Sequence, residues 1–217
     1  MKTFFISGIG TDVGKTIASA ILTEALQANY WKPVQAGFAE GTDKELVQSL
    51  ITNNRSIFFD ETYRLQLPAS PHIAAREDGI QIDTDKILFQ FEKIKNNAAP
   101  DDILIIEGAG GLMVPLNENE FVIDLIKKLD AKTILVSRNY LGSINHSLLS
   151  AAVCKEKGIS SAGWIFNDTY MQYEDEIVAW SGIPKIASLP FCAAITKEFI
   201  FEAAAKLKER IVSVLAE

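Results

Sequence analysis

The chain has 217 residues, of which 48% are apolar and 23% are charged. This is enough to bury one sizeable core, and the length fits one domain, residues 1–217, better than two. The formal net charge of -7 argues against a nucleic-acid-binding surface, because polyanion binders need clusters of surplus Lys and Arg. The apolar runs are too short for a membrane span or the core of a signal peptide, so we expect a cytoplasmic globular protein.

Short apolar runs alternate with longer amphipathic ones along the chain. The expected strands are 3–7, 32–35, 102–108, 132–137, 161–167 and 185–190. The expected helices are one starting near Lys15, then 43–51, 84–97, 121–129, 144–158, 173–180 and a long one after Thr196. Residues 55–79 are the least regular, and we expect a loop there over the mouth of a site. The alternation predicts an α/β fold, a mostly parallel sheet with helices on both faces.

A glycine-rich segment, SGIGTDVGKT, lies between the first expected strand and the first expected helix. It resembles the phosphate-loop pattern G-x-x-x-x-G-K-S/T, but five residues rather than four separate Gly8 from Gly14. Gly14 would let backbone amides approach phosphates, Lys15 would bring a charge to the outer phosphates, and Thr16 would offer its hydroxyl to Mg²⁺. The alternative is an ordinary glycine-rich turn with a solvated lysine. The order strand, loop, helix favours a phosphate-loop NTPase type of fold.

Three charged side chains stand near the ends of expected elements. Glu107 ends an apolar strand and is followed by four small residues, which would let a ligand approach. Lys32 ends another short strand, where its charge would be costly unless it met an anion. Asp43 opens a helix, where the plain alternative is an N-cap. Glu107 and Asp43 are the candidate carboxylate ligands for Mg²⁺, beside Thr16.

Motifs spread over nearly the whole chain, in order and at similar spacings, resemble those of the dethiobiotin synthetase family. They are GTDVGKT at 10–16, KPVQAG at 32–37, SPH at 70–72, EGAGGLMVPL at 107–116, LGSINH at 141–146 and AGWIFND at 162–168. The resemblance implies a homodimer that joins 7,8-diaminononanoate, carbon dioxide and ATP into dethiobiotin, ADP and phosphate in biotin biosynthesis. It also implies ATP as a substrate, Mg²⁺ as a cofactor, and a route through a carbamate and a carbamic-phosphoric mixed anhydride.

The same resemblance implies roles for individual residues. The catalytic residues would be Lys15, Lys32 and Thr11, and the Mg²⁺ ligands would be Thr16, Asp43 and Glu107. The nucleotide would be bound by Gly8, Gly10, Thr11, Asp12, Val13, Gly14, Lys15, Thr16, Glu107, Gly110, Asn167, Asp168 and Pro190. The diamine would be bound by Thr11, Asp12, Lys32, Ala36, Gly142 and Asn145, the last two across the dimer interface.

Some of these positions have plain structural alternatives on residue type alone. Ser143 or Asn145 is equally well explained as the residue that starts a helix. Asn167 with Asp168 would otherwise be interpreted as a turn. Pro190 is chosen from its position after an expected strand and from the family.

The sequence departs from the family pattern in four places. Only the residues ANYW separate the first helix from Lys32, so the second strand is expected to be short. Ala36 stands where some relatives have a hydroxyl residue, which removes one possible hydrogen bond to the substrate. Asp12 replaces the longer Glu of some members, and Gly10 occupies a position that is often Asp or Asn.

Two other classes of protein share a similar loop and sheet. Amidating cobyrinic acid diamide synthases usually carry a second, glutamine amidotransferase domain, for which 217 residues leave no room. Partitioning ATPases place an extra lysine near the start of the loop, where this chain has Gly8-Ile9-Gly10. Both comparisons favour the diamine-carboxylating enzyme.

The cysteines and histidines are expected to be structural. Cys154 and Cys192 are far apart and match no zinc or redox spacing, so both are expected to be buried packing residues. His72 and His146 are expected to cap or pack, because phosphoryl transfer of this kind needs no histidine base.

Overall fold

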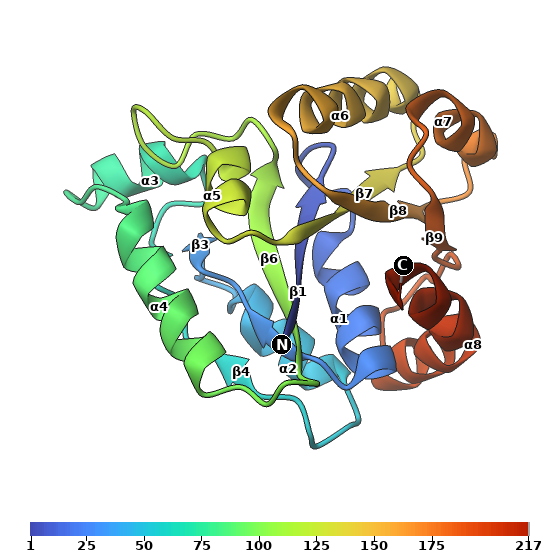
Figure 1. Ribbon diagram of the computed structural model, residues 1–217, viewed down its shortest axis with the longest axis horizontal. Coiled ribbons are helices and arrows are strands. Elements are labelled where there is room, and N and C mark those ends of the chain that lie inside the picture. Colours follow the sequence, from blue (N-terminus) through green and yellow to red (C-terminus); the bar gives the residue numbers. More distant parts are fainter. Residues whose placement is uncertain (217) are drawn as a thin grey trace.

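A parallel sheet forms the centre of the computed structural model, which describes residues 1–216. Its strands are β1 (Lys2–Gly8), β2 (Asn29–Trp31), β4 (Phe58–Phe59), β6 (Ile103–Gly111), β7 (Lys132–Arg138), β8 (Ser161–Asn167) and β9 (Lys185–Ser188). The seven strands lie in the order β4-β2-β6-β1-β7-β8-β9, and every neighbouring pair is parallel. Figure 1 shows β1 and β6 side by side near the middle of the sheet. The predicted mostly parallel sheet is confirmed.

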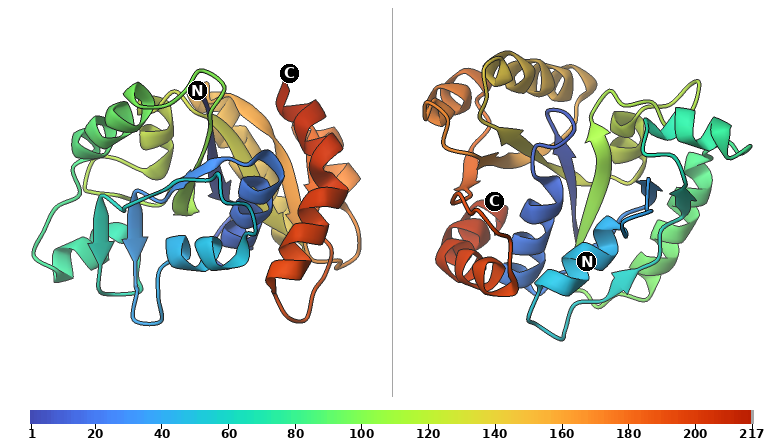
Figure 2. Two further views of the ribbon diagram at one scale, coloured as in Figure 1. Left: turned by 90° about the horizontal axis from the view of Figure 1, so that it is seen from below. Right: turned by 180° about the vertical axis from the view of Figure 1, so that it is seen from behind.

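Helices cover both faces of this sheet (Figure 2). They are α1 (Lys15–Leu26), α2 (Asp43–Leu50), α3 (Pro71–Glu77), α4 (Thr84–Asn96), α5 (Val122–Lys128), α6 (Ser143–Lys157), α7 (Glu174–Ser181) and α8 (Lys197–Ala216). Residues of α1, α2 and α8 share one buried core, and residues of α3 to α7 share the other. Each helix that the sequence predicts is present. None of the helices in the described range is both long and apolar enough to cross a bilayer.

Alternating side chains of the central strands supply both cores. Phe4 and Ile6 of β1 pack in the core under α1, while Phe5 packs in the core under α4 and α5. In β6, Ile105 faces the first core and Leu104 the second. Because successive side chains of a strand point to opposite faces, an almost continuous apolar run buries the sheet on both sides. A charged residue at the end of such a strand is therefore conspicuous.

Two segments differ from the sequence-based expectation. Residues 55–79 contain β4, β5 (Tyr63–Leu65) and α3 rather than one loop. The expected strand at 32–35 is found only in part, since Lys32 and Pro33 lie between β2, which ends at Trp31, and β3 (Val34–Ala36), which pairs with β5 in a separate two-stranded sheet. The break falls at Pro33, which has no N–H for a ladder hydrogen bond. Strands of two or three residues are too short to give a period of two, so the sequence does not reveal them.

The cysteines differ in their surroundings. Cys154 is buried in the core as predicted, but Cys192 is partly exposed in the loop after β9, so the prediction for Cys192 is wrong. Its thiol lies 2.9 Å from the carbonyl oxygen of Ala194. Both histidines make local contacts, His72 with Ser70 at 3.1 Å and His146 with the Tyr140 hydroxyl at 2.7 Å.

Candidate active site

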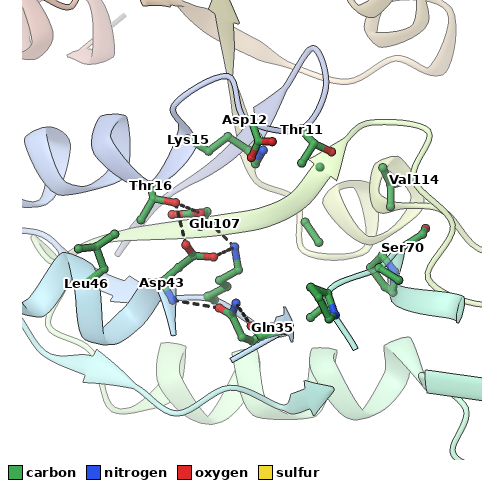
Figure 3. A pocket seen from close by; sticks show the side chains of 18 of the residues that line it. Thr11, Asp12, Lys15, Thr16, Gln35, Asp43, Leu46, Ser70, Glu107 and Val114 are labelled. Carbon is green, nitrogen blue, oxygen red and sulfur yellow. Dashed lines mark hydrogen bonds and ion pairs between the residues drawn. The ribbon is translucent and has the colours of Figure 1, made fainter. Parts of the chain in front are cut away.

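A cavity of about 870 Å³ opens at the carboxyl ends of β1, β3 and β6. Loops that follow neighbouring parallel strands meet at this edge of a sheet, which is where ligands bind in such folds. Many residues that the sequence singles out line this cavity: Thr11, Asp12, Gly14, Lys15, Thr16, Lys32, Ala36, Asp43, Glu107 and Gly110. Ser70 and Pro71 also line it, which confirms that the SPH segment borders the site (Figure 3).

The loop after β1 folds back tightly before α1 begins. Gly14 has φ 93°, and a Cβ on it would collide with the side-chain amide of Asn167. A Cβ on Gly8 would lie 2.6 Å from the carbonyl oxygen of Gly10. The Lys15 ammonium lies 3.2 Å from that same carbonyl, over the loop. The loop therefore has the compact shape and the free first-turn amides of α1 that anion binding requires.

A cluster of charged and polar side chains lies below this loop (Figure 3). Thr16 Oγ1 lies 3.0 Å from Asp43 Oδ1 and 3.0 Å from Glu107 Oε1. The Lys32 ammonium lies 2.5 Å from Asp43 Oδ2 and 3.0 Å from Glu107 Oε1. Four residues from α1, the end of β2, the start of α2 and β6 thus share one set of contacts.

Burial and opposite charge act against each other in this cluster. Burial disfavours the charged form of Lys32, but Glu107 and Asp43 outweigh it and raise the pKa of Lys32 above its ordinary value. Burial likewise opposes ionisation of Asp43, yet the neighbouring Lys32 and the Thr16 hydroxyl bring its pKa below the ordinary value. For Lys15, burial dominates over Glu107 and lowers the pKa. Lys32 and Asp43 are therefore held as a charged pair.

The oxygens of Thr16, Asp43 and Glu107 fit a magnesium ion. An octahedral Mg²⁺ has bonds of about 2.1 Å, so neighbouring ligand oxygens lie about 3 Å apart. The two oxygen–oxygen distances from Thr16 are both 3.0 Å. The described residues 1–216 contain no group of three or more His, Cys, Asp or Glu side chains that could hold a metal ion by themselves. A Mg²⁺ ion usually keeps several waters and binds substrate phosphates beside one or two carboxylates, which suits a site with two carboxylates.

The N-terminus of α2 shows whether Asp43 only caps this helix. Thr42 is the N-cap residue, and it forms a capping box with Glu45. Interpreting Asp43 as a plain N-cap is therefore wrong, because its carboxylate points to Thr16 and Lys32 instead. The backbone N–H of Asp43 donates to Gln35 Oε1 at 3.1 Å, which adds a further restraint.

Four other predicted residues, Asn167, Asp168, Pro190 and Gly142, do not line this cavity in the described part of the chain. Asn167 donates from Nδ2 to the carbonyl of Val13 at 3.3 Å, and so contacts the loop after β1. Asn167 is the last residue of β8, and the chain bends at Asp168, which has φ 75° and donates its N–H to Asn167 Oδ1 at 3.0 Å. Pro190 is exposed after β9. Gly142 is the N-cap of α6, and its φ is 102°.

Asn145 lies in the first turn of α6 and is exposed. Neither Asn145 nor Gly142 lines the cavity of this single chain as far as residues 1–216 describe it. The alternative that Ser143 starts the helix is confirmed, since Ser143 is the first residue of α6 after the N-cap Gly142, and the same alternative for Asn145 is wrong.

Two buried polar side chains beside the cluster have no role predicted from the sequence, although one of them, Gln35, lies within the motif KPVQAG. Gln35 lines the cavity and donates from Nε2 to the carbonyl of Gly37 at 2.9 Å. Tyr30 donates its hydroxyl to Glu107 Oε2 at 2.9 Å. Burial, and then the charge of Glu107, raise the pKa of Tyr30 well above its ordinary value, so its phenol stays a donor. The period of two along NYWK, which relates Tyr30 to Lys32, is a signal that could have found it.

Comparison with known proteins places the chain in a family. A model of the AAA domain matches residues 2–198. The ATP-dependent dethiobiotin synthetase of Christiangramia forsetii is 44% identical over 219 residues, which cover 98% of this chain and 99% of that protein. The chain belongs to the ATP-dependent dethiobiotin synthetase family. The synthetase of Cytophaga hutchinsonii is also 44% identical, over 95% of this chain and 97% of that protein. The resemblance inferred from the motifs is confirmed.

The solved structures that resemble this synthetase-family chain have the phosphate-loop ATPase fold. The septum site-determining protein MinD of Pyrococcus horikoshii, in complex with Mg-ADP, has a TM-score of 0.60 at 17% identity. The match covers 99% of this chain and 92% of that chain. This likeness shows the fold alone. The fold alone does not distinguish a partitioning ATPase from a synthetase. The sequence relatives do, because they are ATP-dependent dethiobiotin synthetases.

Replacing Gly14 by Ala is predicted to weaken nucleotide binding at least about tenfold, because the methyl group adds backbone strain and displaces Asn167. Gly158→Ala is the matched control, since Gly158 has φ 68° and no atom near its missing Cβ. The control is expected to lose about 1 kcal/mol of stability and no nucleotide affinity. Calorimetric titration with ATP compares the two variants. Wild-type affinity in Gly14→Ala would contradict the role of this turn.

Proposed function

We propose that the protein closes the ureido ring of dethiobiotin from 7,8-diaminononanoate, carbon dioxide and ATP, with release of ADP and phosphate, in biotin biosynthesis. Family membership supports this reaction. The observation that carries the site is the convergence of Thr16, Lys32, Asp43 and Glu107 under a phosphate loop. Residues 1–217 would act as one ligase domain, in the cytoplasm, where ATP is supplied.

The reaction would have three chemical steps. One amine of the substrate adds to carbon dioxide and loses a proton, which gives a carbamate. A carbamate oxygen attacks the γ-phosphorus of ATP and expels ADP, which gives a carbamic-phosphoric anhydride. The second amine attacks the carbonyl carbon, closes the ring and expels phosphate. All three steps depend mainly on positioning and on neutralising charge.

The chain's own cations would neutralise that charge. Lys15, whose ammonium lies 3.2 Å from the Gly10 carbonyl of the loop, would neutralise the transferring phosphoryl group. Lys32 would stabilise the carbamate and the anhydride, because its ammonium is kept charged by Glu107 and Asp43. Thr11 and Asp12, exposed at the cavity edge, would face the reacting amines, and Ala36 would line the diamine side.

Thr16, Asp43 and Glu107 would hold Mg²⁺. When bound, the ion would supply a Lewis acid for the outer phosphate oxygens. The resemblance of the fold to a MinD protein described with Mg-ADP supports a magnesium nucleotide here. Asn167, which contacts the loop after β1, would read the adenine with its amide. The nucleotide would further contact Gly8, Gly10, Val13, Gly14, Gly110, Asp168 and Pro190.

A homodimer is part of the proposal, with Gly142 and Asn145 of one subunit binding the substrate carboxylate at the other subunit's cavity. An apolar hollow of about 290 Å³ between the loops after β1 and β6 and helix α6 supports it. Met113 and Leu149 line this hollow and are 50% and 56% exposed. Thr11 lines both the hollow and the main cavity, so a subunit seated there would border the diamine.

Phosphate release from Mg-ATP and bicarbonate, with and without 7,8-diaminononanoate, tests the proposed function. We expect release to depend on the diamine, and mass spectrometry to find one dethiobiotin for each phosphate. Slow release that ignores the diamine would leave the nucleotide site but contradict the synthetase reaction.

Lys15→Ala and Lys32→Ala are predicted to remain folded and to lose at least about 100-fold in turnover, because each removes a cation from the site of developing charge. Lys206→Ala, on the exposed surface of α8, is the matched control and is expected to keep wild-type turnover. Circular dichroism checks folding, and the phosphate assay checks turnover. Near-normal rates in either Lys15→Ala or Lys32→Ala would overturn the assigned role.

Asn145→Ala is predicted to raise the KM for the diamine about tenfold with little change in the KM for ATP, because it removes a polar partner of the substrate carboxylate only. The exposed Asn54 provides the control variant, Asn54→Ala, with no expected effect. Steady-state kinetics with each substrate varied in turn separate the two constants. An equal loss toward both substrates would speak against the proposed dimeric diamine site.

A further inference from the structure

Tyr30 is a buried residue in contact with Glu107, one of the three candidate metal ligands. It lies in β2, between β4 and β6, and its side chain has no exposed surface. The ring packs against Phe58, with 5.8 Å between ring centroids. Its hydroxyl donates to Glu107 Oε2 at 2.9 Å. Tyr30 thus contacts the Glu107 oxygen that Thr16 and Lys32 do not contact.

The two oxygens of Glu107 consequently have different partners. Oε1 faces Thr16 and Lys32, each at 3.0 Å, while Oε2 faces only Tyr30 among the described hydrogen-bond partners. The Glu107 side chain is 1% exposed, so no solvent replaces a lost partner. Rotating the carboxylate to bring both oxygens toward the cavity would break the Tyr30 bond and leave a buried phenol unpaired, which is unfavourable.

This restraint bears on which divalent cation the site accepts. Mg²⁺ requires near-octahedral geometry and suits carboxylates that each offer one oxygen, whereas Ca²⁺ accepts six to eight oxygens and often takes a carboxylate through both. We propose that Tyr30 is a positioning residue that confines Glu107 to one oxygen and thereby favours Mg²⁺ over Ca²⁺. The inference rests on the proposed function, because it takes Thr16, Asp43 and Glu107 as the ligands.

The test compares wild type with Tyr30→Phe, which removes only the hydroxyl. Mn²⁺ bound with a non-hydrolysable ATP analogue is followed by electron paramagnetic resonance while Mg²⁺ or Ca²⁺ displaces it. We expect the preference for Mg²⁺ over Ca²⁺ to fall at least about tenfold in Tyr30→Phe, the usual effect of losing one hydrogen bond to a charged group. An unchanged preference in a folded variant overturns the inference.

Tyr63→Phe is the matched control. Tyr63 is also buried, and its hydroxyl bonds to the backbone of Asp83, away from the cluster. We expect wild-type metal preference in this variant. If the preference for Mg²⁺ over Ca²⁺ fell as much as in Tyr30→Phe, loss of any buried hydroxyl would explain the effect, and the inference would be overturned.

A second substitution keeps a donor at the same place. Replacing Tyr30 by 4-aminophenylalanine is expected to retain the wild-type preference, and a preference lowered as in Tyr30→Phe overturns the inference. The wild-type protein provides the separate check on the proposed function. If it holds no Mn²⁺ in the presence of the nucleotide analogue, the proposed metal site itself is wrong, irrespective of Tyr30.

Discussion

The ammonium of Lys32, held between Asp43 and Glu107, is the interaction on which the candidate site depends. The buried carboxylate of Glu107 and the half-buried one of Asp43, both in contact with one hydroxyl, would repel each other without a cation. Lys32 compensates both, and it joins the end of β2, the start of α2 and the middle of β6. This ion cluster is therefore both a structural junction and a source of charge for chemistry.

The order of strands makes this junction possible. Because β6 lies between β2 and β1, Glu107 has Lys32 on one side and Thr16, at the start of α1, on the other. All three strands are parallel, so their carboxyl ends and following loops meet at one edge. The apolar run of β6 buries the strand up to Glu107, and the small residues after it leave the cavity open.

The sequence is most informative where a pattern is long or where a charge breaks it. The strand expected at 161–167 is found with the same bounds, because its apolar run is continuous, and Glu107 stands out because it ends such a run. The short strands of residues 55–79 depend on pairing with β2 and β3, which no local pattern reveals. Tyr30 and Gln35 escaped notice for a related reason, since their partners lie 77 and 8 residues away and only the fold brings them together.

The central claim is that this cluster activates a carbamate by transferring the γ-phosphoryl group of ATP to it. Oxygen-18 in carbon dioxide tests this most directly, in a reaction that is mixed and quenched before the label exchanges with water. The account predicts that each phosphate released with dethiobiotin carries one labelled oxygen, because the carbamate oxygen that attacks phosphorus leaves with it. Phosphate that carries no oxygen from carbon dioxide would contradict the account.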